Sequence, residues 1–243
     1  MRWLVFARRN LRELVRDPLT LCFGLGFPVA VLLLLTVIQR HVPVPLFELS
    51  ALTPGIAVFG LSFVSLFSAQ LLSQDMASAF LLRLLLTPMR PVDFLLGYAV
   101  PFVPLSVLQC AVCGACAWAL GLPLSGWLAV WVIGCIPSAL FFIALGLLLG
   151  SMLSVRQVGG ICGALLTNLS AWLSGTWFSL DLLGSGVAAV ARALPFSHAV
   201  EYGRALLSGD MQTALVHLCW VLGYALLALL LAVPAFLHRA YGD

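Results

Sequence analysis

Runs of about twenty apolar residues are the feature that most limits what this chain can fold into. One run follows Pro18 and continues to about residue 39, and another fills residues 213–237. A water-soluble core could not bury several such runs, whereas each is long enough to cross about 30 Å of hydrocarbon. Because 63% of the 243 residues are hydrophobic and only 9% are charged, the sequence predicts an all-α integral membrane protein.

The apolar runs predict six transmembrane helices in a single membrane domain, residues 1–243. An even number of crossings places both ends of the chain on the same side of the membrane. The expected spans cover residues 20–39, 54–72, 94–120, 127–153, 158–178 and 213–237.

Two regions outside these spans are also expected to be helical. In residues 1–17, apolar and arginine positions recur at helical spacing, which predicts an amphipathic helix in the membrane surface with Arg9, Arg12 and Arg16 on its polar side. Arginines spread through this segment, and a full-length span after it, are not typical of a cleaved signal peptide. Residues 179–212 contain several glycines and Pro195, and they predict two short helices on the outer side.

The arginines indicate the orientation in the membrane. All twelve basic residues are arginine, and a cytoplasmic amino terminus places nine of them inside and three outside. The three outer ones are Arg40, Arg192 and Arg204. This distribution obeys the positive-inside rule, which the inverted topology would violate. The net charge of +3 is small and scattered, so nucleic acid is not an expected partner.

Few groups in the expected spans could hold a driving ion or perform catalysis. Only His217 falls well inside a span, where a packed neutral histidine is favoured over a proton relay. The chain has no lysine, which a phosphate-binding loop requires, so any ATPase activity is expected in a partner subunit and the chain itself is not expected to be an ATPase. The cysteines lie in apolar runs without histidines at ligand spacing, and no metal site is expected.

Two other functions remain open on these residues. An intramembrane serine protease could use Gly60-Leu61-Ser62, with His217 or His198 as the base. An ion-coupled transporter or channel is the second alternative, and it is disfavoured by the scarcity of charge in the spans.

Small residues form two further patterns. Ser62, Ser65 and Ser68 recur every three residues, and they either line a translocation pathway or bond back to the carbonyls of their own helix. Gly159 and Gly163 form a small-xxx-small pair, which predicts close helix packing or a contact with a second subunit.

Three stretches together resemble the permease subunit of ATP-binding-cassette transporters of the type-2 exporter family. They are the arginine-rich start RRNLRELVRDPLTLCFGLGFPVAVLLLL, the segment LLRLLLTPMRPVDFLLG, and LPFSHAVEYGRALLSGD before the last span. The similarity covers nearly the whole chain in order. The chain departs from the family by carrying Asp75 where members commonly have a glutamate, and FSLDLLGSG in place of a Pro-rich outer turn.

The resemblance implies half of a transporter in the cell (inner) membrane. Two six-span permeases, identical or sister chains, would work with two separate cytoplasmic ATPase subunits, which bind the ATP and Mg; no cofactor is expected on this chain. The expected function is to form the export pathway. Because the spans carry few fixed charges, the expected substrate is hydrophobic or amphipathic.

Residues 74–93 are expected to be the cytoplasmic coupling loop, on which an ATPase would dock. Pro88 and Pro91 end one helix and fix the start of the next, while the charges of Arg83, Arg90 and Asp93 keep the segment out of the membrane. A positively anchored turn without a partner is the alternative. The residues expected to contact the ATPase are Phe80, Leu81, Arg83, Leu84, Leu85, Thr87, Pro88 and Arg90.

Overall fold

The computed structural model describes residues 2–78 and 89–241, and every regular element in these ranges is a helix. The first half contains α1 (Arg2–Arg16), α2 (Pro18–Leu21), η1 (Cys22–Gly26), α3 (Phe27–His41), η2 (Pro45–Phe47), α4 (Leu49–Met76), α6 (Pro91–Ala99) and α7 (Phe102–Ala119). The second half contains α8 (Gly126–Gly134), α9 (Ile136–Met152), α10 (Val155–Gly160), η3 (Ile161–Leu166), α11 (Thr167–Leu173), η4 (Leu180–Leu183), α12 (Ser185–Ala193), α13 (Pro195–Ser208) and α14 (Met211–Tyr241). The all-α prediction is confirmed for the described residues.

Five helical stretches in the described part of the chain are long and apolar enough to cross a membrane. They are Pro18–His41, Leu49–Met76, Pro91–Ala119, Gly126–Met152 and Met211–Ala240. Each corresponds to a predicted span, with ends that agree to within five residues. The chain is therefore a multi-pass membrane protein.

The remaining prediction, a span over residues 158–178, falls on a helix that is not among these five. The elements α10, η3 and α11 form a continuous helical run from Val155 to Leu173. Polar residues such as Arg156, Gln157 and Asn168 lower its hydropathy. The helix ends before the predicted boundary because Gly175 adopts a positive φ of 72°, a conformation that terminates helices.

Prolines break two of the spans into segments. The third span is divided into α6 and α7 at Val100 and Pro101, and the fourth into α8 and α9 just before Pro137. A proline within a helix removes one backbone hydrogen bond and clashes with the preceding turn. These spans are therefore jointed, although the sequence predicts each as a single helix.

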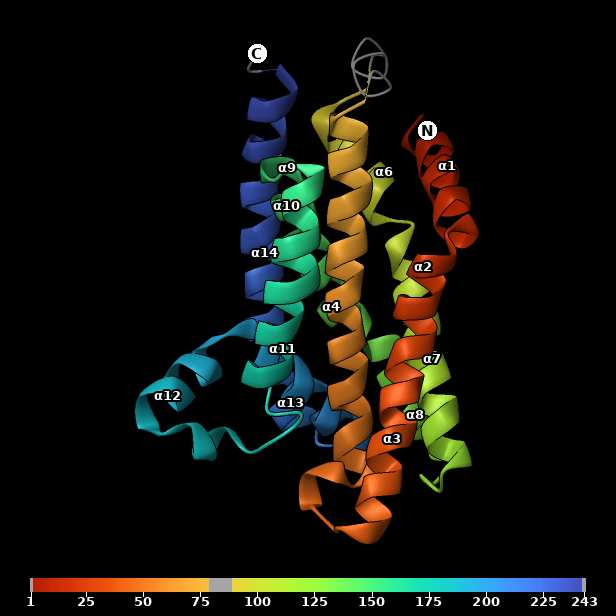
Figure 1. Cartoon of the computed structure of the whole chain (residues 1–243), viewed down its shortest axis with the longest axis vertical. Coiled ribbons are helices and arrows are strands. Elements are labelled where there is room, and N and C mark those ends of the chain that lie inside the picture. The colour runs from red at the N-terminus through yellow and green to blue at the C-terminus, as the bar shows by residue number, and fades with distance from the viewer. Residues whose placement is uncertain (1, 79–88, 242–243) are drawn as a thin grey trace.

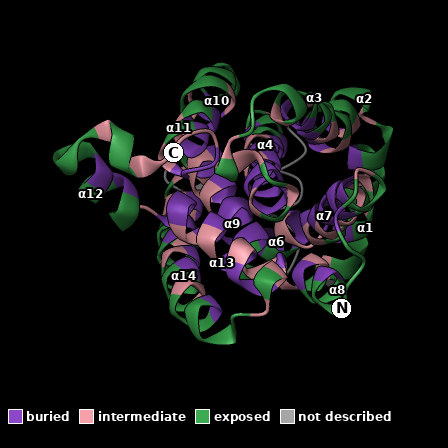
Figure 2. Cartoon of the chain, turned by 90° about the horizontal axis from the view of Figure 1, so that it is seen from below, coloured by how far each residue is buried: buried purple, intermediate pink, exposed green. Residues whose placement is uncertain are grey.

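The centre of the bundle is formed by α4 packed against α9 (Figure 2). Glycines on α9 allow this close approach. A Cβ atom on Gly146 would lie 2.4 Å from the carbonyl oxygen of Ser65, and one on Gly150 would lie 2.7 Å from that of Ala69. Close backbone contact at small residues is the usual way in which membrane helices associate tightly.

The two ends of the bundle differ in their elements (Figure 1). Both termini lie at one end, where α1 is found, α4 ends and α6 begins; we call it the α1 end. The opposite end carries α12 and α13, and we call it the α12 end. There α12 projects sideways from the bundle (Figures 1 and 2), which places a short amphipathic helix beside the spans.

Candidate functional site

At the α1 end, helix α1 is seated on the first turns of α6. Phe6 is buried and packs edge-on against Tyr98, with ring centroids 4.9 Å apart and planes at 85°. Phe94 forms the other wall of this seat. A Cβ atom on Gly97 would lie 2.2 Å from Cδ1 of Phe6, so only glycine allows α1 to approach α6 so closely.

A polar network joins α1 to the helices on both sides of residues 79–88. Nη1 of Arg9 lies 2.8 Å from Oδ2 of Asp75 on α4, whose side chain is only 8% exposed. The hydroxyl of Tyr98 on α6 donates to the same oxygen over 2.9 Å. Nδ2 of Asn10 donates to the carbonyl of Gly97 over 3.0 Å. The end of α4, the start of α6 and α1 are thereby linked through one buried carboxylate.

The start of α6 is capped from within the predicted coupling loop. Arg90 is exposed at the N-cap, its backbone N–H donates to Oδ2 of Asp93 over 2.9 Å, and Pro91 occupies the first helical turn. Such a cap with proline at the first position fixes where a helix begins. The other residues expected to contact an ATPase, at positions 80, 81, 83, 84, 85, 87 and 88, lie outside the described residues.

An arginine side chain also donates hydrogen bonds to carbonyl groups at the end of a helix here. Nη1 of Arg239 on α14 donates to the carbonyls of Gly150, Ser151 and Leu153, the closest at 2.7 Å. These carbonyls end α9 and have no partner within their own helix. Of the surface-helix arginines, Arg9 also pairs with Glu13, whereas Arg12 and Arg16 are exposed.

The family model of ABC-2 type transporters matches residues 1–207 of the chain, a range that includes the whole α1–α4–α6 network. The chain belongs to this family. No curated protein matches it. It is therefore a permease of an ATP-binding-cassette transporter, a membrane component rather than a catalytic enzyme, in a family that works with ATP-binding subunits.

The three serines Ser62, Ser65 and Ser68 of this permease are fully buried on α4, and Ser65 and Ser68 lie against Gly146 of α9. Ser62 donates to the carbonyl of Phe59 and Ser68 to that of Ser65, over 2.6 and 3.1 Å. The hydroxyl of Ser65 is buried without a hydrogen-bond partner in the described structure. Two of the three thus bond back to their own helix, and a role in lining the pathway stays a prediction.

The residues of the possible protease motif, Gly60-Leu61-Ser62, have a packing role in the structure. A Cβ atom on Gly60 would lie 2.0 Å from Nε2 of Gln109, which donates to the carbonyl of Ala57 over 2.9 Å. Gly60 therefore makes room for a bond between α7 and α4, and Ser62 is fully buried. Neither the family nor this geometry favours the protease.

The glycine pair faces two different surroundings. Gly163 is in ordinary contact with Leu66 of α4, 3.5 Å from the place of a Cβ atom, whereas a Cβ on Gly159 would meet no atom within 4 Å. Only Gly163 lies against another helix of the same chain. A contact of Gly159 with a second subunit stays a prediction.

A pocket of about 440 Å³ whose lining includes two ion pairs lies at the α12 end. Within it, Nδ1 of His198 on α13 lies 2.8 Å from Nδ1 of His217 on α14. Arg204 is tied to the carbonyls of Ala51 and Gly175 and to Glu201. The pocket therefore combines fixed charges with a histidine pair.

The sequence did not single out several of these residues. Asn10 and Tyr98 carry no motif, since their bonds depend on how α1 lies on α6. His198 and His217 are nineteen positions apart, and no spacing in the sequence predicts that they form a pair. The sequence shows only that Asp75 lies just before the predicted coupling loop, and it does not indicate that α1 and α6 contact this residue.

Proposed function

We propose that this ABC-2 permease forms the export pathway of an ATP-binding-cassette transporter in the inner membrane, paired with a second permease of the same or a sister chain. Separate cytoplasmic ATPases would bind and hydrolyse MgATP and dock on residues 79–90. The observation that carries the proposal is the network around Asp75. It ties α4 and α6, the helices that flank this segment, to the surface helix α1.

Six crossings are part of this proposal. Both termini lie at the same end of the bundle (Figure 1), and five crossings would place them at opposite ends. The helical run from α10 to α11 extends along α4 between the two ends and packs against it. Its polar residues would then face the interior of the assembly rather than lipid.

The arginines support a cytoplasmic α1 end. Helix α1, the start of α6, the start of α10 and the end of α14 carry arginine at this end, whereas α3 ends and α12 and α13 lie at the other. This is the distribution that the positive-inside rule requires. Helix α1 would lie in the inner membrane surface, with its exposed arginines among the lipid headgroups.

The substrate that suits this pathway is hydrophobic or amphipathic. The buried polar groups of the central helix α4 are mainly hydroxyls, and its one buried charge, Asp75, is already held by Arg9 at the cytoplasmic end. A charged solute would find few partners along such a path.

The proposal is tested by reconstitution into liposomes. The chain alone is expected to hydrolyse no ATP, whereas the complex with its cognate ATPase hydrolyses ATP and moves hydrophobic dyes from a panel. Hydrolysis by the isolated chain would contradict the division of labour. Transport confined to small inorganic ions would contradict the substrate class.

A double-mutant cycle at the network tests its part in coupling. Arg9→Gln and Asp75→Asn are each expected to lower ATP-driven dye transport, because the first leaves the buried Asp75 carboxylate without its cationic partner and the second removes the charge that Arg9 and Tyr98 contact. The double variant should lose less transport activity than the two single losses together predict. Because Arg9 is partly exposed, the coupling energy should lie toward the lower end of about 0.5–3 kcal/mol. Transport and ATP hydrolysis are measured in the same liposomes.

The matched control is Arg16→Gln, which removes the same charge from an exposed position of α1. It should leave both activities near the wild-type level. Strict additivity of the Arg9 and Asp75 effects would argue that the two residues act separately, against the proposed link.

A further inference from the structure

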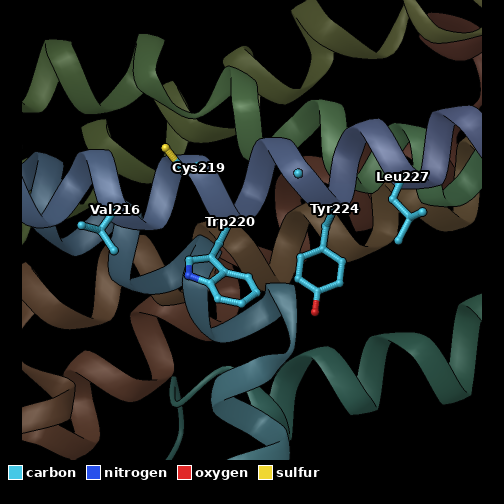
Figure 3. A pocket seen from close by; sticks show the side chains of 6 residues that line it. Val216, Cys219, Trp220, Tyr224 and Leu227 are labelled. Carbon is cyan, nitrogen blue, oxygen red and sulfur yellow. The ribbon is translucent and has the colours of Figure 1, made fainter.

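The histidine pair at the α12 end belongs to a joint between α13 and α14. Besides the contact of 2.8 Å between its two Nδ1 atoms, the ring of His198 stacks on Trp220 of α14, with centroids 4.8 Å apart and planes at 5°. Tyr224, one turn further along α14, donates its hydroxyl to the carbonyl of Ala193 at the end of α12 over 2.7 Å. Figure 3 shows Trp220 and Tyr224 on the same side of α14.

The contact between the two rings allows only one proton between the Nδ1 atoms. When both rings are neutral, one Nδ1–H donates to the other nitrogen, and the same bond survives if one ring becomes an imidazolium. A second added proton places two N–H donors and two positive charges face to face. The contact is then repulsive, so the joint holds with up to one added proton and fails with two.

The surroundings disfavour extra protons on the pair. Burial lowers the pKa of His198 below its ordinary value, and the neighbouring His217 lowers it further, while the Arg192 carbonyl and Glu201 act in the opposite direction. Nε2 of His198 is buried without a hydrogen-bond partner in the described part of the chain.

The charged groups around the pair are already matched with each other. Glu201 pairs with Arg204, and Asp181 with Arg192. Among the described residues that line the pocket, both carboxylates, Asp181 and Glu201, are therefore already paired and not free to compensate a second positive charge. The groups that line or face the pair are Asp181 on η4, Arg192 on α12, Glu201 and Arg204 on α13, and Tyr224 on α14.

We propose that His198 and His217 form a proton-sensitive joint, and that mild acid at the α12 end separates α12 and the start of α13 from α14 and widens the pocket that the two histidines line. In the proposed topology this end faces the outside, where the pH of the medium would act on the exit of the pathway. The inference goes beyond transport itself, and its structural readout needs neither substrate nor ATPase.

The direction of the response follows from proton counting. The closed joint holds fewer protons than the open one near the ordinary histidine pKa of about 6.5. Closure is therefore fully favoured above that pH and is lost as the pH falls below it. Each unit by which closure lowers the pKa of His198 changes the ratio of open to closed joints about tenfold.

The experiment measures spin-label distances between α12 and α14 in the full chain in lipid nanodiscs. Labels are attached through Val187→Cys and Leu230→Cys, both at exposed positions, after the two exposed cysteines, Cys22 and Cys219, are changed to serine. Dilution with unlabelled chain restricts the signal to distances within one chain. Between about pH 8 and about pH 5, on either side of the ordinary histidine pKa, we expect a longer distance to become the major population.

His198→Gln and His217→Gln should each abolish this shift, because glutamine keeps a polar side chain but takes up no proton. His41→Gln changes an exposed histidine at the end of α3 and should retain the shift. An unchanged distance in the wild-type chain would overturn the proposal. So would a full shift in both pair variants, or loss of the shift in His41→Gln. Two pair variants guard against the misfolding of one.

Discussion

Glutamate in place of both Leu84 and Leu85 is expected to abolish co-purification of the ATPase partner while the permease still inserts into the membrane. A few fully desolvated residues near the centre of an interface contribute most of its affinity, and truncating one of them commonly costs about 2 kcal/mol or more. A carboxylate adds the loss of solvation to this cost. Two such changes should weaken binding by a factor of about 1,000. Affinity purification of the tagged permease measures the outcome.

The control for these changes is Leu182→Glu with Val187→Glu, which introduces the same charges at exposed positions of the α12 end and should leave partner binding intact. If residues 79–90 are only an anchoring turn, the leucine variants will bind the ATPase normally. Removing Arg83 and Arg90 will then disturb the orientation instead, as cysteine accessibility of the loop would reveal. Normal binding by the leucine variants would refute the docking assignment.

Alanine at Gly146 is expected to destabilise the permease strongly. The new Cβ would lie 2.0 Å from Oγ of Ser68 and 2.4 Å from the carbonyl oxygen of Ser65. The serine hydroxyl can rotate, but the backbone carbonyl cannot move without separating α4 from α9. Overpacking of this kind costs about 1–3 kcal/mol, measured as a lower free energy of unfolding and a lower yield of monodisperse protein in detergent.

Gly223→Ala is the matched change, since a Cβ there meets no atom within 4 Å and α14 is helical at this position. It should be neutral or stabilising by up to about 1 kcal/mol, because alanine is the better helix former. Equal stability of the two variants would show that the contact between α4 and α9 is looser than the structure indicates.

The contact between α4 and α9 also shows how far the sequence can identify the glycines at which helices pack closely. The spacing of Gly159 and Gly163 predicts close packing, yet Gly146 and Gly150 have the same spacing and make the closer contact. Periodicity identifies residues that can share a helix face, but it does not say which face another helix covers. That information lies in the packing of distant segments.

By itself the sequence determined that this chain crosses a membrane several times, that α1 is amphipathic and that its family is that of ABC-2 permeases. These properties follow from the apolar length of each span, from the arginine spacing within one segment and from the order of motifs along the chain, none of which requires knowing which helices touch. Only the tertiary structure decided that Asp75 meets Arg9 and Tyr98, and that His198 meets His217. Such contacts join residues on different helices, and the angle and register at which helices pack depend on the side chains of both partners at once.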